Sequence, residues 1–216
     1  MADTVARRGL RLPHEPTRPQ RLPPDQDADP AGEETELIAR AAAGDRSASS
    51  GIVDRYWDRL YRWLFRLTHD RHQAEDLAQE TFLKALAALG SFRPGSNFRA
   101  WLFRIGHNNF VNLKRVAKRQ AAPMPDEFPA ADPGASPSTH ASDREDLKRL
   151  YVAVAELPVD FRTALLLRAE EGLSFREIAG ILRITEETAR WRVFKARQKL
   201  VKAYDADSAD DGTGDS

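Results

Sequence analysis

The stretch from Thr81 to Pro125 combines positive charge with aromatic side chains. It contains eight Lys/Arg residues and no Asp or Glu, and six aromatic residues are interleaved with the cations. Cations neutralise phosphates, and aromatic rings can stack on bases that have left a duplex. A second acid-free stretch, Thr188 to Tyr204, carries six more Lys/Arg residues. The sequence therefore predicts two surfaces that face nucleic acid. The aromatic residues of the first stretch are Phe82, Phe92, Phe98, Trp101, Phe103 and Phe110.

The formal net charge of zero results from segments of opposite charge. Residues 32–120 hold 15 basic and 10 acidic side chains, and residues 143–204 hold 13 and 10. Residues 121–142 carry three acidic side chains and no Lys/Arg, and residues 205–216 carry five acidic side chains and no Lys/Arg. Charge blocks of this kind concern binding partners more than they concern the fold.

Composition excludes several classes of protein. The chain has no cysteine, so it can form neither a disulfide nor a thiolate metal site, which suits a reducing cytosol. No apolar run approaches the roughly 20 residues of a membrane span, and the N-terminus lacks the apolar core of a secretion signal. We expect a cytoplasmic protein without membrane insertion, and no cofactor is implied.

Proline marks the domain boundaries. Eleven of the 13 prolines lie in 1–31 and 121–142, which are poor in apolar residues and cannot bury enough surface to offset chain entropy. We predict a disordered N-terminal extension at 1–32, a first domain at 33–120 and a flexible acidic linker at 121–142. A second domain follows at 143–204, and the acidic tail at 205–216 is predicted to be disordered.

Hydrophobic periodicity predicts that both domains are helical. Apolar residues recur every three or four positions over 52–67 and again over 74–89. Asn97 is a good N-cap for a third helix whose apolar stripe runs from Phe98 to Val116. If that helix continues to Arg119 it is roughly 35 Å long. Strand-like alternation is absent, so the predicted fold is all-α, with two small helical domains joined by a Pro/Ala/Asp-rich linker.

The sharpest local pattern lies in the second domain. Ser174 and Glu177 form a capping box that opens a short helix, and Thr185 can cap the helix that follows a three-residue turn. Small Ala179 allows the two helices to cross closely, and Ile184 would fill the corner between them. This arrangement is a helix-turn-helix, whose second helix would enter the major groove of DNA.

Three stretches of this chain carry a resemblance to a known family. They are EDLAQETFLK at 75–84, SFRPGSNFRAWLFRIGHNNFVNLKR at 91–115, and the segment 157–200 from LPVDFRTALLLRAEEGLSFREIA through TARWRVFKARQKL. Together, in this order and spacing, they resemble the extracytoplasmic-function (ECF) group of bacterial RNA polymerase sigma factors. The resemblance covers about residues 35–120 and 143–203. It implies a transcription initiation factor and no catalysis by the chain itself.

The first stretch resembles the segment that docks on core RNA polymerase. The resemblance implies contacts with the coiled coil of the β′ clamp from the helix face away from the apolar residues, and the second domain is expected to meet the β flap. A mixed acidic and polar stripe suits a basic protein surface. The implied docking residues are Asp76, Gln79, Glu80 and Lys84.

The second stretch resembles the segment that melts the promoter and reads its minus-ten element. Phe92 matches the position that helps to hold a flipped base, and Asn108 matches a position that contacts it. An amide offers both a donor and an acceptor for this purpose. We expect His107 to be an exposed helix residue without a special role. The cations expected to hold the DNA backbone are Arg99, Arg104, Lys114 and Arg115.

The third stretch resembles the domain that reads the minus-thirty-five element. Arg190, Trp191 and Lys195 fall at matching positions of the recognition helix, Phe194 would contact a base or pack, and Arg197 would contact the DNA backbone. The resemblance also implies a cognate anti-sigma protein and an acidic linker that passes through the polymerase toward the RNA exit.

The chain departs from the family pattern at three positions. Ser49 stands where an aromatic residue is usual, Arg183 stands in the turn where Gly is favoured, and Trp191 replaces a commonly small residue. A left-handed Arg183 would cost something like 1 kcal/mol. The large indole of Trp191 could change which minus-thirty-five sequence is read.

Two other functions are compatible with parts of the sequence. A stand-alone helix-turn-helix regulator would bind duplex DNA without polymerase. It would not need the aromatic side chains of residues 91–119 for stacking on bases. An enzyme with a metal cluster is suggested superficially by His69 and His72, which lie near Asp70, Glu75 and Asp76. Asp70 also suits a helix cap, and no phosphate loop, nucleophile elbow or zinc spacing is found.

Overall fold

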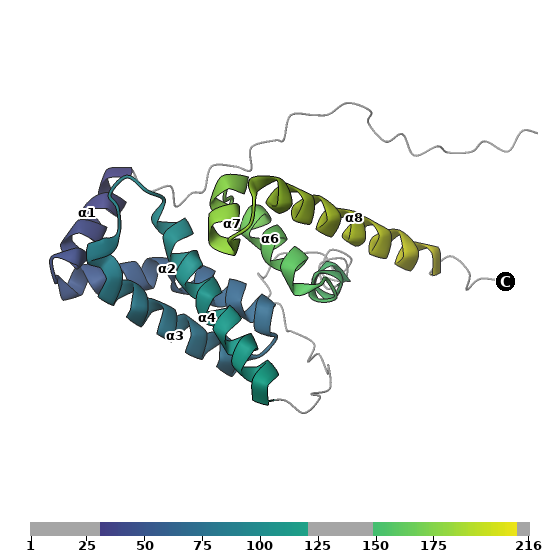
Figure 1. Cartoon of the computed structure of the whole chain (residues 1–216), viewed down its shortest axis with the longest axis horizontal. Helices are drawn as coiled ribbons and strands as arrows, with labels where there is room; N and C mark the ends of the chain where they lie inside the picture. The colour runs from purple at the N-terminus through teal and green to yellow at the C-terminus, as the bar shows by residue number, and fades with distance from the viewer. Residues whose placement is uncertain (1–30, 121–148, 211–216) are drawn as a thin grey trace, which may run out of the picture.

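The computed structural model of the protein describes residues 31–120 and 149–210. These residues form helices joined by short connections, and no strand occurs among them (Figure 1). The all-α prediction is therefore confirmed. Our predictions for the N-terminal extension up to residue 30 and for the linker 121–142 lie outside the described residues.

The first domain consists of α1 (Ala31–Ala42), α2 (Arg46–Thr68), α3 (Arg71–Ala88), a short 3-10 helix η1 (Leu89–Ser91) and α4 (Phe98–Gln120). Helix α2 packs against α1, α3 and α4, and α3 also packs against α4. The arrangement leaves one face of α3 and most of the C-terminal half of α4 toward solvent. Two surfaces of this domain are thus available to partners.

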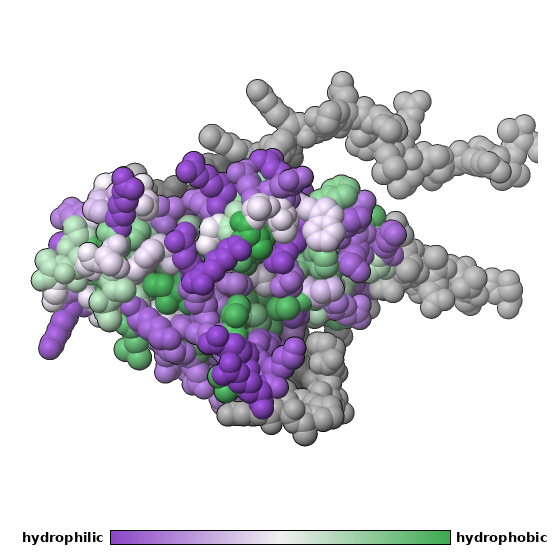
Figure 2. Space-filling model, viewed as in Figure 1, coloured by the Kyte–Doolittle hydropathy of each residue, from purple (hydrophilic) through white to green (hydrophobic). Residues whose placement is uncertain are grey.

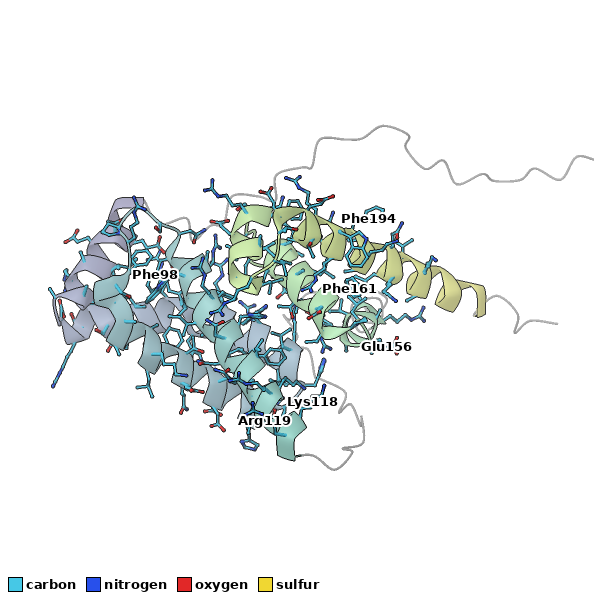
Figure 3. The ribbon with its side chains drawn as sticks, viewed as in Figure 1. Phe98, Lys118, Arg119, Glu156, Phe161 and Phe194 are labelled. Carbon is cyan, nitrogen blue, oxygen red and sulfur yellow. The ribbon has the colours of Figure 1, made fainter. Side chains whose placement is uncertain are left out.

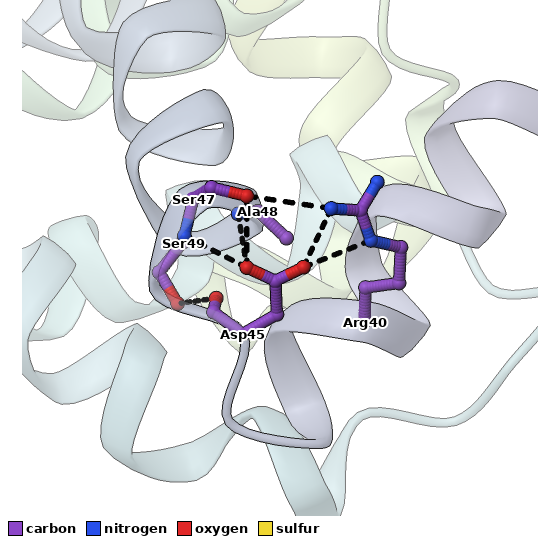
Figure 4. A network of polar contacts seen from close by, with 5 residues as sticks. All are labelled: Arg40, Asp45, Ser47, Ala48 and Ser49. Carbon is purple, nitrogen blue, oxygen red and sulfur yellow. Dashed lines mark hydrogen bonds and ion pairs between the residues drawn. The ribbon is translucent and has the colours of Figure 1, made fainter.

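A network of polar contacts fixes the beginning of α2 (Figure 4). The Asp45 carboxylate accepts hydrogen bonds from the backbone N–H groups of Ser47 at 2.8 Å and Ala48 at 3.2 Å, as an N-cap does. The Arg40 Nε donates to the other carboxylate oxygen at 2.9 Å. These hydrogen bonds, with that of Arg40 first, hold the pKa of Asp45 well below its usual range.

Apolar residues spaced by three and four positions on α2 form the centre of the first core. Leu60, Trp63 and Leu64 are fully buried there. Gly106 of α4 lies against this layer, where a Cβ atom would come within 3.1 Å of Leu60 Cδ1. The glycine therefore allows α4 to cross α2 closely, a role that outweighs its low helix propensity. The predicted stripe of α4 extends too far, since Val116 is 45% exposed.

The second domain begins with helical residues 149–155 and continues with α6 (Val159–Ala169), α7 (Phe175–Leu182) and α8 (Glu186–Asp210). Its core is built mainly of aliphatic side chains, with Leu167, Leu173, Ile178 and Ile181 fully buried. Helix α8 packs against both α6 and α7. It continues past residue 204, where we predicted the ordered part to end, and is described through Asp210.

The two domains lie against each other. Helix α7 packs on α4, and α6 contacts α2, so residues 70 or more positions apart in sequence are neighbours (Figure 1). Helix α8 begins beside α7 and extends away from the first domain (Figure 1). The contact between the domains is therefore made by only part of the second domain.

Candidate nucleic-acid interface

One face of α3 presents the residues predicted to dock on polymerase. The side chains of Asp76, Gln79, Glu80 and Lys84 are all exposed, whereas Leu77, Ala78 and Phe82 are buried in the core. The Lys84 Nζ donates to Glu80 Oε1 at 2.5 Å, one turn away on the same helix. Leu83 lies beside these groups and is 71% exposed, a residue that the sequence analysis did not select. The face is polar and charged with one apolar side chain at its edge.

The segment before α4 is held by its first turn and by an aromatic cluster. The Asn97 Oδ1 accepts a hydrogen bond from the backbone N–H of Ala100 at 3.1 Å, which confirms the predicted cap. The ring centroid of Phe92 lies 5.3 Å from that of Phe98 and 5.4 Å from that of Trp101, both edge-on. Edge-to-face pairs of this kind are favourable. Phe92 is thus positioned by the cluster while part of its side chain stays exposed.

The cations of α4 lie along its outer side. Arg104, Lys114 and Arg115 are exposed, and Arg99 and Asn108 are half-buried. Lys118 and Arg119 extend the positive charge to the end of the helix, where hydrophilic residues cover the surface (Figures 2 and 3). No acidic residue occurs in α4, so all the charged side chains that this helix exposes are positive. Such a surface suits the phosphates of a nucleic acid.

Two polar residues of α4, His107 and Asn109, are more buried than the sequence analysis indicated. His107, which we predicted to be exposed, is half-buried because the second domain covers it. Burial, with further contributions from Arg183 and Arg192, lowers the pKa of His107 to about 4, although Asp160 opposes the shift. Asn109 is buried and is hydrogen-bonded to α3, whereas the sequence analysis selected only its neighbour Asn108.

The helix-turn-helix forms as its capping residues predict. The Ser174 hydroxyl accepts from the Glu177 backbone N–H at 3.2 Å, and Glu177 accepts in return from the Ser174 backbone N–H at 2.7 Å. Thr185 caps α8 through a hydrogen bond of 3.1 Å from the Thr188 backbone N–H. Arg183 in the turn has a φ of 55°, in the left-handed region that favours glycine.

The recognition helix α8 presents side chains of two kinds. Trp191 is 50% exposed and Phe194 is 56% exposed, and Figure 3 shows Phe194 on α8. The indole of Trp191 packs on Phe161 of α6 with ring centroids 5.4 Å apart. Arg197 is exposed and Lys195 is half-buried. The exposed side of α8 therefore combines cations with aromatic surface.

Arg190 is held in place from two sides. Its Nη2 lies 2.5 Å from Glu186 Oε1, one turn earlier on α8, and its guanidinium lies over the ring of Phe175, 4.9 Å from the ring centroid. The Arg168 guanidinium also lies over this ring, at 4.8 Å. Contacts of both kinds restrict the rotamers of the long Arg190 side chain.

Two of the residues that suggested a metal cluster, His69 and Asp70, have structural roles at helix ends. Asp70 is the N-cap of α3, and its Oδ1 accepts from the Gln73 backbone N–H at 3.0 Å, which lowers the pKa of Asp70. His69 ends α2 in a left-handed conformation with a φ of 56°. Within residues 31–120 and 149–210 no group of three His, Asp or Glu side chains is placed to hold a metal ion.

The helices in the same ranges include none that is long and apolar enough to cross a membrane.

The geometry thus defines a DNA-binding protein with a helix-turn-helix domain and a second basic helical domain. Residues 52–120 match the family described as Sigma-70 region 2, and residues 147–200 match Sigma-70, region 4. The RNA polymerase sigma-H factor of Pseudomonas aeruginosa is 35% identical over 79% of this chain and 93% of its own length. The ECF RNA polymerase sigma factor SigE of Mycolicibacterium smegmatis is 34% identical over 80% of this chain and 68% of its own.

Two solved structures are similar over most of the chain. CnrH, in complex with the cytosolic domain of CnrY, has a TM-score of 0.60 and 29% identity and covers 81% of this chain and 98% of its own. The sigma factor RpoE of Bartonella quintana, in complex with the anti-sigma factor NepR, has a TM-score of 0.64 and 29% identity. The match covers 73% of this chain and 97% of RpoE. The chain belongs to the ECF group of RNA polymerase sigma factors, which direct polymerase to promoters to initiate transcription.

Proposed function

We propose that this chain divides the work of initiation among three surfaces. The exposed face of α3, with Asp76, Gln79, Glu80 and Lys84, docks on the β′ clamp of core polymerase. Phe92 and α4 melt the minus-ten element and capture a base, and α8 reads the minus-thirty-five element as duplex. The chain performs no catalysis itself, and its polymerase partner implies a cytoplasmic location.

The main support for this assignment is that the chain has two basic helices, one on each domain. Helix α4 carries cations and half-buried Asn108 beside the aromatic cluster of Phe92. Helix α8 carries Arg190, held over Phe175, and two exposed aromatic side chains. Stacking groups serve single-stranded bases, whereas a helix after a tight turn serves the major groove. One chain therefore carries side chains suited to single-stranded DNA and a helix suited to duplex DNA.

Partners other than DNA follow from the surfaces and from the relatives. The polar face of α3 suits a basic protein surface, and the second domain is expected to meet the β flap. The solved relatives CnrH and RpoE are bound to CnrY and to NepR, and NepR is described as an anti-sigma factor. We infer that an anti-sigma protein binds this chain as well.

Run-off transcription by core polymerase on a genomic fragment library tests the proposal. With the protein present, specific transcripts should begin downstream of a shared two-part element. Asn108→Ala should lower their yield, and Arg190→Ala should relax the requirement for the upstream part, since a good base contact provides roughly 1–3 kcal/mol of discrimination. Duplex binding without any effect on core polymerase would instead identify a stand-alone regulator.

A further inference from the structure

Two exposed aromatic side chains share one face of α8. Trp191 and Phe194 are three positions apart, and residues at this spacing are neighbours on the surface of a helix. Both are about half exposed, and the residues beside them, Arg190 and Lys195, are cations. Large apolar groups in water gain free energy only when a partner covers them. The aromatic pair therefore marks a contact with a partner.

Trp191 is held in place by α6. Its indole packs on the ring of Phe161, in the first turn of α6, with the ring centroids 5.4 Å apart and the ring planes inclined by 53° (Figure 3). Phe161 is itself half-buried and packs against the core of the domain. Tilted aromatic pairs of this kind are favourable. The exposed part of the indole is thus supported from below by a ring that the core fixes.

The residue after Trp191 contacts the same turn of α6. The Arg192 Nη2 lies 3.2 Å from Asp160 Oδ2, one position before Phe161. The side chain of Arg192 is only 19% exposed, whereas that of Arg190 is 61% exposed. An exposed ion pair adds little stability, but this pair turns Arg192 toward α6. Two consecutive residues of α8 therefore contact the first turn of α6, which fixes the direction of the indole.

The place of Trp191 along α8 matters for what it can contact. The helix begins at Glu186, so Trp191 lies in its second turn. In a helix-turn-helix, the side chains near the N-terminus of the recognition helix contact the edges of bases in the major groove. With α8 in the groove as we propose, the exposed part of Trp191 faces base edges.

The major groove offers one apolar group to such a side chain. Its base edges present hydrogen-bond donors and acceptors, with the C5-methyl group of thymine as the exception. A carbon edge of the indole placed against a purine N7 or O6 would remove water from a polar atom without replacing its hydrogen bond, which is costly. Contact with the methyl group instead buries apolar surface on both partners. The chemistry of the groove therefore favours thymine opposite Trp191.

We propose that Trp191, braced by Phe161, is a specificity-determining residue that reads the C5-methyl group of a thymine in the minus-thirty-five element. This inference rests on the proposed function, because it requires α8 in the major groove. It adds a requirement for an A·T pair at one fixed position of the element. That requirement is separate from any base that Arg190 reads by hydrogen bonding.

Replacement of thymine by deoxyuridine tests the proposal, since deoxyuridine pairs as thymine does and lacks only the C5-methyl group. Run-off transcription with core polymerase and the full-length chain first defines the upstream element. Each thymine of that element, on either strand, is then replaced singly, and the affinity of the holoenzyme for each promoter duplex is measured by competition. With the parent chain, replacement at one position should weaken binding roughly fourfold, as expected for the loss of one buried methyl group.

Substitutions in the chain assign that effect to a side chain. Trp191→Ser should bind the thymine and deoxyuridine duplexes equally at this position, whereas Trp191→Phe keeps an apolar ring and should retain part of the difference. Phe161→Leu removes the supporting ring and should also reduce the difference. Arg190→Ala is the matched control, because it should lose discrimination at another position and keep the full deoxyuridine effect. Circular dichroism checks that all variants keep their helix content.

Equal affinity of the parent for all deoxyuridine duplexes would overturn the proposal. A deoxyuridine effect that persists in Trp191→Ser would also overturn it, by assigning the methyl contact to another side chain such as Phe194. Uniform weakening of every duplex by Trp191→Ser, without any sensitive thymine, would place the indole on the DNA backbone instead. An upstream element that depends on Arg190 but has no sensitive thymine leaves the proposed function standing, whereas transcription without any upstream requirement would overturn both.

Discussion

Lys84 on α3 and Asn109 on α4 are joined by a hydrogen bond of 2.7 Å from the ammonium nitrogen to the amide oxygen. The Asn109 Nδ2 in turn donates to the Thr81 hydroxyl at 3.0 Å, and this hydroxyl donates to the Leu77 carbonyl at 2.6 Å. Asn109 is buried, and both polar atoms of its amide are hydrogen-bonded to side chains of α3. A polar connection therefore ties the proposed polymerase-docking helix to the proposed DNA-melting helix.

The two adjacent asparagines of α4 should behave differently when substituted. Asn109→Ala removes a buried amide and leaves Thr81 without one partner, so we expect the free energy of unfolding to fall by about 1–3 kcal/mol. Asn108→Ala should change the free energy of unfolding by less than about 1 kcal/mol, because its side chain is only half-buried. Urea denaturation followed by circular dichroism measures both.

In run-off transcription the order of the two variants should be reversed, with Asn108→Ala having the larger effect. Asn108→Ala should lower run-off transcription roughly tenfold or more at a temperature where both variants are folded, because it removes a base contact worth about 1–3 kcal/mol. Asn109→Ala should retain most activity there. An Asn108→Ala variant that is destabilised yet fully active would assign Asn108 to packing instead.

Local patterns predicted the parts of this fold that depend on neighbours in sequence. The caps at Asp70, Asn97, Ser174 and Thr185 form as expected, because each needs only a backbone N–H two or three residues away. The helix-turn-helix followed from the same signals. The exposure of the polar α3 face also followed, since helical phase places it opposite the apolar residues.

Features that depend on packing between helices were not predictable in this way. Asn108 and Asn109 are the same residue type in consecutive positions, and only the crossing of α3 and α4 decides which is buried. His107 is covered by the second domain, which no pattern within residues 33–120 reveals. Gly180 and Arg104 are 76 positions apart, and their contact depends on how the domains are placed.

The left-handed Arg183 should limit the stability of the second domain. Its φ of 55° is costly for a residue with a Cβ atom, and glycine adopts this conformation without the clash. We expect Arg183→Gly to raise the free energy of unfolding by about 1 kcal/mol, as measured by urea denaturation. Arg183→Ala is the control, since it removes the charged side chain but keeps the Cβ, and it should give no such gain. An equal gain from alanine would mean that charge, and not backbone strain, sets the cost.

Leu83 should strengthen docking on polymerase. It is 71% exposed on α3, one turn from Gln79 and Glu80, where an apolar group gains only if a partner covers it. Burying a leucine contributes about 1.5–3 kcal/mol, so Leu83→Gln should weaken binding to core polymerase by roughly tenfold or more while changing stability by less than about 0.5 kcal/mol. Binding of labelled protein to core polymerase gives the measurement. Val111→Gln, at a 46% exposed position on α4, should leave this affinity unchanged.

Acidification should open the two domains. In the structure, where the two domains pack together, burial with Arg162 and Lys114 nearby lowers the pKa of His69 to about 4. The pKa of His107 is lowered to about 4 by burial and by Arg183 and Arg192. Separation of the domains returns both toward the ordinary value of 6.5. The open state therefore binds more protons, so closure is fully favoured above pH 6.5 and weakens as the pH falls from about 6.5 toward 4.

The chain has no cysteine, so Ala87→Cys and Lys199→Cys, at exposed positions on different domains, give a unique pair of sites for dyes whose energy transfer measures this change directly. Between pH 7.5 and pH 5 the transfer should fall in the parent chain, reversibly. The double variant His69→Asn with His107→Gln should respond far less over the same range, because neither new side chain titrates and asparagine tolerates the left-handed conformation at position 69. The lower limit of pH 5 keeps most carboxylates ionised. A parent chain whose energy transfer is constant over this range would show that the histidines stay accessible to protons in the closed state.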